Sequence, residues 1–186
     1  MRAIILKQFG GYDSLVIENL PAPVPKAGSV LIEVKAFGIN HAETHMRKGE
    51  WAEAATVSGI ECVGLVKSCP GGEFEVGTKV TAFMGGLGRT INGSYAEYTC
   101  PPATNVVAIK TDLSWEELAV IPESYATAWT CLHRNRSWIK WPQGFTKQSR
   151  LESFNLTRFG RRTRRWNRIK PMVKWWFASE GFGQVL

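Results

Sequence analysis

The sequence has no run of apolar residues as long as a membrane span requires, so it is not predicted to cross a bilayer. Its first residues contain no apolar segment followed by a small-residue cleavage site, so no secretory signal is expected. The four cysteines lie far apart and form no C-x-x-C pair, which favours reduced thiols over a disulfide framework. These absences predict a cytoplasmic protein, and 186 residues suffice for one domain with an extension.

Acidic residues are almost missing from the last part of the chain. Residues 134–186 contain 13 Lys and Arg but only 2 Asp and Glu, a net charge of +11, whereas residues 1–133 contain 10 and 14, a net charge of −4. Five of the eight tryptophans also fall in 134–186. This asymmetry predicts a folded domain over 1–133 and a separate basic, Trp- and Arg-rich tail over 134–186 that is disordered or irregular.

Residues 1–133 show many short alternating or apolar runs separated by Gly- and Pro-rich turns. In 29–37, apolar Val30, Ile32 and Val34 alternate with polar neighbours, as in a half-buried strand. Short helices are expected over 42–48, after Asn40, and from Ser114, where Ser114-x-x-Glu117 matches a capping box. Pro122 interrupts this second helix, which then continues over 123–132. The other expected strands are 2–9, 15–20, 58–67, 79–83, 94–100 and 105–110, and together they predict a mainly β barrel or sandwich.

Several of these segments, in order, resemble the medium-chain dehydrogenase/reductase superfamily, and within it the zinc-independent quinone oxidoreductase branch. They are GSVLIEVKAFGINHAETHMRKGEW (28–51), SGIECVGLV (58–66), FEVGTKVTAF (74–83), NGSYAEY (92–98) and DLSWEELAVIPESYATAWTCL (112–132). The resemblance implies a GroES-like barrel that forms one wall of an active-site cleft. In complete family enzymes a Rossmann domain follows, holds NADPH and presents its nicotinamide to a small quinone or enone. The resemblance is also compatible with a homo-oligomer.

The resemblance further implies that this chain binds no zinc. Relatives with zinc place a cysteine ligand at the position of Asn40 and a histidine ligand at that of Ile60, and neither residue found here supplies the thiolate or imidazole that catalytic zinc prefers. The cysteine-rich lobe of those relatives has no counterpart. His41 and His45 are four residues apart and can share a helix face, but no third ligand lies at a fixed spacing from them. No metal site is therefore expected.

The resemblance places two candidate residues beside the nicotinamide, both catalytic and cofactor-binding. Asn40 would hydrogen-bond a substrate carbonyl or a water, since its amide is both donor and acceptor; the alternative is that it caps the next helix. Thr127 matches a family threonine that packs under the nicotinamide, and its alternative is a hydrogen bond back to its own helix.

Arg47 and His45 complete the candidate site. Arg47 belongs to an R-x-G motif and either anchors a loop or faces the cofactor. His45 and Trp51 stand where many relatives have tyrosines, which leaves His45 as the candidate catalytic proton donor because histidine changes charge near neutral pH. Glu61 is expected to be a structural carboxylate at the edge of the cleft, and the alternative is that it tunes the site. The glycine-rich segment 85–93 opens no helix, so it is read as a hairpin loop beside the substrate rather than a phosphate-binding loop.

Residues 134–186 lack the strand, Gly-rich turn and helix that grip a dinucleotide in this family. The sequence therefore predicts a truncated family member that is inactive alone. The genetic code suggests that the tail is the family's C-terminal end translated out of frame. When the third base of each codon is joined to the first two bases of the next, Trp166–Asn167 must encode Glu, Met172–Val173 must encode Gly and Trp175–Trp176 must encode Val, as in the family's C-terminus. The alternative is a non-catalytic binding module whose basic tail contacts nucleic acid or an anionic membrane.

Overall fold

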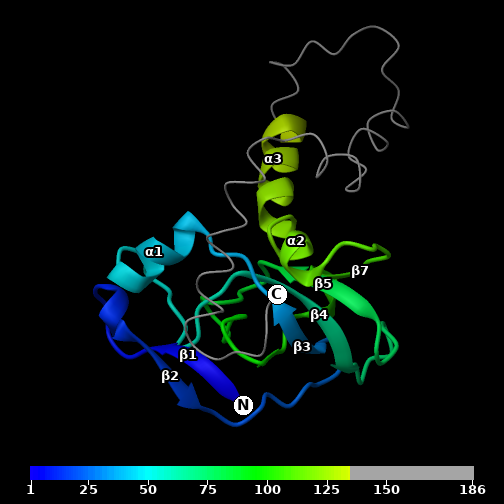
Figure 1. The fold of residues 1–186 in the computed structure, drawn as a ribbon, viewed down its shortest axis with the longest axis horizontal. Coiled ribbons are helices and arrows are strands. Elements are labelled where there is room, and N and C mark those ends of the chain that lie inside the picture. The colour runs from blue at the N-terminus through cyan, green and yellow to red at the C-terminus, as the bar shows by residue number, and fades with distance from the viewer. Residues whose placement is uncertain (135–186) are drawn as a thin grey trace, which may run out of the picture. The chain divides into compact units, whose positions relative to one another are not determined.

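The computed structural model describes residues 1–134 of the chain (Figure 1). The chain divides into two compact units, Met1–Tyr125 and Ala126–Leu186, and every described strand belongs to the first. The prediction of a mainly β fold with short helices is confirmed. The strands are β1 (Arg2–Leu6), β2 (Leu15–Asn19), β3 (Leu31–Ala36), β4 (Glu61–Ser68), β5 (Lys79–Phe83), β6 (Tyr98–Thr99) and β7 (Val106–Ala108).

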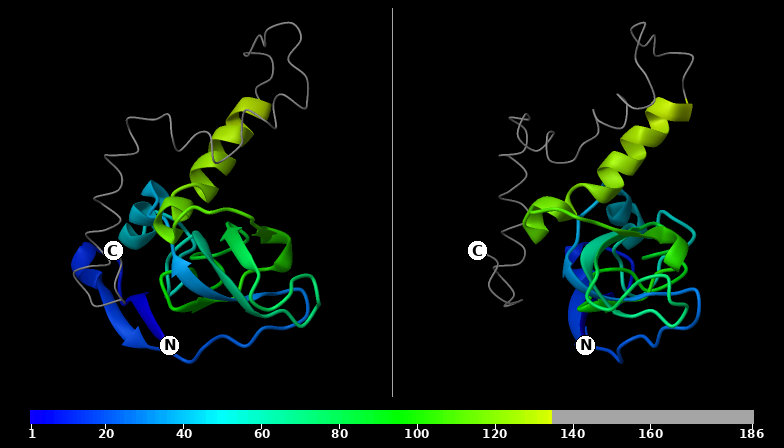
Figure 2. Two further views of the ribbon diagram at one scale, coloured as in Figure 1. Left: turned by 45° about the vertical axis from the view of Figure 1, so that its right-hand side comes forward. Right: turned by 90° about the vertical axis from the view of Figure 1, so that its right-hand side faces the viewer.

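The strands form two antiparallel sheets, one of two strands in the order β1-β2 and one of five in the order β6-β3-β4-β5-β7. Figure 2 shows the larger sheet from two further directions, with β3, β4 and β5 side by side. The central strand β4 is the most buried, because both of its faces are covered. Ile32, Val63, Val66 and Val80, which belong to the three central strands, have no exposed surface and form the middle of the core.

The predicted barrel is not closed by a continuous ladder. Isolated bridges, Ala3↔Ala96 and Ile5↔Val57, join β1 to neighbouring segments instead. The expected strand 94–100 is therefore reduced to β6, because the backbone of 94–97 divides its hydrogen bonds among three partners. The N–H of Ile4 donates to the Tyr95 carbonyl at 2.8 Å, whereas the N–H of Val34 donates to the Glu97 carbonyl at 2.9 Å.

Each helix begins where the sequence places a start signal. The helix α1 (His41–Lys48) follows Asn40 and ends at Gly49, whose φ of 77° is the left-handed conformation that favours glycine. The predicted capping box starts α2 (Trp115–Ala119): the Glu117 N–H donates to Ser114 Oγ at 3.3 Å. The predicted interruption at Pro122 separates α2 from α3 (Pro122–Arg134), since proline suits the first position of a helix. None of the helices in the described part of the chain is both long and apolar enough to span a bilayer.

Candidate active site

Asn40 lies at the start of α1 and is held by a glutamate on each side. It is the N-cap residue of the helix, and its backbone N–H donates to Glu43 Oε2 at 2.6 Å. Its side-chain amide donates from Nδ2 to Glu61 Oε1 at 2.8 Å. The residue is partly exposed, so the candidate substrate-binding amide is anchored from the protein interior while part of it remains accessible.

Glu61 begins β4 and is almost fully buried, with 2% of its surface exposed. Besides the Asn40 amide it accepts the backbone N–H of Glu123, in the first turn of α3, at 2.8 Å. Burial, followed by the nearby carboxylates of Glu43 and Glu123, raises the pKa of Glu61 to about 7 although both hydrogen bonds lower it. The expected structural carboxylate therefore connects three segments far apart in the sequence, and its charge changes near neutral pH.

Glycine at position 38 is required for this arrangement. A Cβ atom added to Gly38 would overlap Glu61 Oε1 and come within 2.8 Å of its Cδ atom. Any larger residue at this position would push the carboxylate away from the Asn40 amide. The glycine before Asn40 in the sequence thus makes room for the side chain that holds Asn40.

Glu43 is the second buried carboxylate, with 5% of its surface exposed. It accepts three hydrogen bonds: from Asn40 N at 2.6 Å, from Tyr95 Oη at 2.7 Å and from the backbone N–H of Ile60 at 2.9 Å. Burial raises the pKa of Glu43, and the three hydrogen bonds oppose the rise. The pKa of Tyr95 is raised well above its usual range, first by burial and then by the Glu43 carboxylate, so Tyr95 acts as a donor.

Sequence reasoning missed the part played by Glu43. The signal was present, because Asn40-x-x-Glu43 has the spacing of a capping box, the same pattern that identified the helix at Ser114. The contact between Glu43 and Tyr95 had no such signal, since 52 positions separate the two residues.

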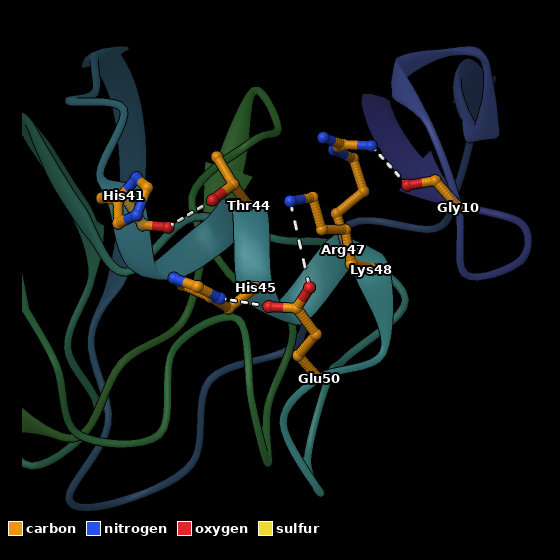
Figure 3. A network of polar contacts seen from close by, with 7 residues as sticks. All are labelled: Gly10, His41, Thr44, His45, Arg47, Lys48 and Glu50. Carbon is orange, nitrogen blue, oxygen red and sulfur yellow. Dashed lines mark hydrogen bonds and ion pairs between the residues drawn. The ribbon is translucent and has the colours of Figure 1, made fainter.

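Two further candidate residues of α1, Arg47 and His45, point to different partners (Figure 3). The Arg47 guanidinium donates to the Gly10 carbonyl, and the Gly10 N–H donates to the Arg47 carbonyl at 2.9 Å. Arg47 thus anchors the loop after β1, which is the first of its two expected roles. His45 Nδ1 pairs with Glu50, and the hydrogen bond from His45 is the largest cause of the lowered pKa of Glu50. The His41 ring stands edge-on to that of His45, with centroids 4.8 Å apart.

The side chains at the two positions where relatives bind zinc do not suit a metal ion. Asn40 offers an amide that is already hydrogen-bonded to Glu61, and Ile60 is a buried aliphatic side chain, so neither position fits a zinc ligand. Within residues 1–134, no group of three or more His, Cys, Asp or Glu side chains is arranged to hold a metal ion.

The glycine-rich segment 85–93 packs as a tight loop between β5 and β6. Leu87 and Ile91 pair in a short bridge, and Gly88 lies so close to Gly59 that an added Cβ would be 3.0 Å from the Gly59 nitrogen. Because it opens no helix, the loop does not provide the helix N-terminus on which a pyrophosphate sits. The loop therefore lacks the structural context of a dinucleotide-binding fingerprint, as the sequence predicted.

Thr127 is exposed on α3. Trp51 follows α1 and is 39% exposed; the Arg89 guanidinium lies over its ring at 5.7 Å and is also paired with Glu53 at 2.9 Å. Position 51 thus carries an aromatic ring that contacts the glycine-rich loop.

The fold and these residues define an N-terminal domain of the alcohol dehydrogenase type. Residues 26–111 match the alcohol dehydrogenase GroES-like domain. The N-terminal portion of the chain accordingly belongs to the medium-chain dehydrogenase/reductase superfamily, as the resemblance indicated, and is quinone oxidoreductase-like.

Known proteins support this assignment over the N-terminal portion only. The chain is 33% identical over 137 residues to the synaptic vesicle membrane protein VAT-1 homolog-like of Mus musculus, which covers 71% of this chain and 31% of that protein. It is 31% identical over 140 residues to the quinone oxidoreductase of Lama guanicoe, covering 71% and 40%. A mycobacterial protein determined complexed with NADPH superimposes with a TM-score of 0.64 at 28% identity, covering 76% and 41%. The chain thus spans less than half the length of these relatives.

Proposed function

We propose that residues 1–133 form the substrate-side domain of an NADPH-dependent, zinc-independent quinone or enone oxidoreductase, and that 134–186 are a separate segment. The observation that carries the proposal is the Asn40 amide, partly exposed and fixed from the interior by Glu61 at 2.8 Å. An amide held in this way can donate its second N–H to a carbonyl oxygen without first being ordered, and preorganised donors of this kind stabilise negative charge that develops on oxygen.

The cofactor would supply hydride from a nucleotide-binding domain, since the loop 85–93 opens no helix and the sequence of 134–186 lacks the family's pattern for a strand, a Gly-rich turn and a helix. The role of the described residues is to bind and orient the carbonyl compound. Asn40 is the proposed catalytic donor, His45 is the proposed proton donor, and Thr127 is proposed to face the cofactor, whereas the Arg47 guanidinium contacts Gly10. The relatives named quinone oxidoreductase and the NADPH-complexed structure support this assignment.

The test joins residues 1–133 to the nucleotide-binding domain of the Lama guanicoe quinone oxidoreductase. We expect the fusion to oxidise NADPH with 1,4-naphthoquinone as acceptor, and Asn40→Ala to lower kcat roughly 100-fold, the effect of removing one oxyanion donor. Asn19→Ala, at the exposed end of β2, is the matched control and should leave kcat unchanged.

The unaltered 186-residue chain serves as the second arm of this experiment. Its fluorescence titration with NADPH should show no saturable binding. Micromolar affinity of that chain, or equal kcat for the two asparagine variants of the fusion, would overturn the proposal.

A further inference from the structure

Glu61 accepts one hydrogen bond at each of its carboxyl oxygens. The Asn40 amide reaches Oε1 and the Glu123 backbone N–H reaches Oε2, each at 2.8 Å. An ionised carboxylate is an acceptor at both oxygens, whereas a protonated one carries a donor on one of them. A proton that points along either contact therefore sets a donor against a donor unless that partner changes.

The two hydrogen-bond donors to Glu61 differ in whether they can also act as acceptors. A backbone N–H is a donor in every state, so the contact from Glu123 keeps Oε2 as an acceptor. The Asn40 side chain has a donor at Nδ2 and an acceptor at Oδ1, and a half-turn about its last bond exchanges them. The proton consequently belongs on Oε1, and Asn40 is the partner that adjusts.

Groups that oppose the ionisation of Glu61 and hydrogen-bond donors that favour it together bring its pKa to about 7. Glu43 on α1 and Glu123 on α3 are like charges that oppose ionisation, and burial opposes it further. The Tyr95 hydroxyl is directed to Glu43, and the neighbouring Cys62 thiol has its pKa raised to about 12 by burial, so neither takes the proton.

We propose that Glu61 is a positioning residue whose charge decides which end of the Asn40 amide is held against β4. With Glu61 ionised, Nδ2 is bound inward, and the amide carbonyl and the second N–H are left for a ligand. With Glu61 protonated, Oε1 donates to Asn40 Oδ1 and both N–H donors of Nδ2 are left. A quinone oxygen accepts hydrogen bonds and donates none, so the protonated state offers it one more matching donor. This consequence for the substrate rests on the proposed function; the coupling between the two side chains does not.

The experiment follows the full 186-residue chain by NMR, with asparagine labelled at its side-chain nitrogen and glutamate at its carboxyl carbon. Asn40→Ala identifies the Asn40 signals. Between about pH 5 and pH 8, the Asn40 amide protons and the Glu61 carboxyl carbon should shift with one shared midpoint near pH 7.

Glu61→Gln should abolish the midpoint of the Asn40 signals. The control Glu33→Gln removes a carboxylate of β3 paired with Lys35 and Lys67 and should leave the midpoint in place. Asn40 signals that do not move while Glu61 titrates, or that still move in Glu61→Gln, would overturn the proposal. If Glu61→Gln does not fold, the shared midpoint in the unaltered chain decides. A fusion inactive towards naphthoquinone would reject the proposed function and leave this titration intact.

Discussion

At the scale of single residues, the two buried carboxylates, Glu43 and Glu61, are costly to place in the interior. Removing an ionised carboxylate from water is unfavourable unless donors replace the lost hydration. Glu43 has three such donors and Glu61 has two. Glu43 therefore relies on its three donors to remain buried. In the described part of the chain, Tyr95 is the one residue whose side-chain hydroxyl donates to Glu43.

Tyr95→Phe tests this dependence. The change removes one donor from a buried carboxylate and should lower the free energy of unfolding by about 1–3 kcal/mol. The hydroxyl holds the pKa of Glu43 down, so its loss raises that pKa further in the folded state. A carboxyl whose folded pKa is raised contributes stability below its unfolded pKa and loses it as pH rises through the folded value. The destabilisation should therefore be smallest in acid and grow as pH rises above the ordinary glutamate range.

Urea unfolding at several pH values measures the effect. The control is Tyr12→Phe, because Tyr12 is 79% exposed and its loss of a hydroxyl should leave stability unchanged. Equal stability of the two variants, or a loss for Tyr95→Phe that does not depend on pH, would show that the hydrogen bond to Glu43 is not made to an ionised carboxylate.

At the scale of elements, glycines allow the loop 85–93 to pack closely against the segment that precedes β4. Gly59 has a φ of 101° and directly precedes Ile60 and Glu61. A Cβ added to Gly93 would overlap the carbonyl oxygens of both Ser58 and Gly59 and lie 2.6 Å from the Ser58 carbonyl carbon. Since these atoms belong to the backbone, they cannot move aside as a side chain does.

Gly93→Ala should therefore shift the start of β4 and lower the free energy of unfolding by about 1–3 kcal/mol, the usual cost of overpacking. Gly11→Ala is the matched control, because nothing lies within 4 Å of the added Cβ there and its φ is negative. Thermal unfolding followed by circular dichroism compares the two. A Gly93→Ala variant that melts together with Gly11→Ala would contradict this packing.

At the scale of the whole molecule, charge is separated along the chain. The folded portion 1–133 is acidic, with a net charge of −4, and 134–186 carry +11. Polyanions recognise such a segment by neutralising its charges and releasing counterions, an effect that falls steeply with salt. This separation is what the alternative of a binding module requires.

Heparin chromatography tests whether the basic residues 134–186 bind a polyanion. The full chain should be retained and should elute with added salt, whereas a chain ending at residue 133 should pass through, because its charge has the wrong sign. Retention of both chains at the same salt concentration would show that the polyanion contacts the folded domain and not residues 134–186. The out-of-frame origin of 134–186 and their expected irregular structure concern residues outside the described part of the chain.

The local elements were predictable from the sequence because their signals are local. Alternation of apolar residues predicted the strands, β5 with both ends correct, and the serine and proline at 114 and 122 predicted where α2 and α3 begin. Motif order indicated the family. The strand expected at 94–100 was wrong in length because its backbone is shared among partners from β1, β3 and the segment before β4, and no pattern within the run records this.

What the sequence alone determined is thus the composition of the domain: a β-rich chain, its helix starts, its family and its uneven charge. Only the tertiary structure decided that Glu61 meets Asn40 across 21 positions and Glu123 across 62. The physical reason is that a hydrogen bond between distant segments depends on how the strands and helices pack. Burial, which sets the pKa of Glu61, is likewise a property of the packed fold and not of the residues beside it in the chain.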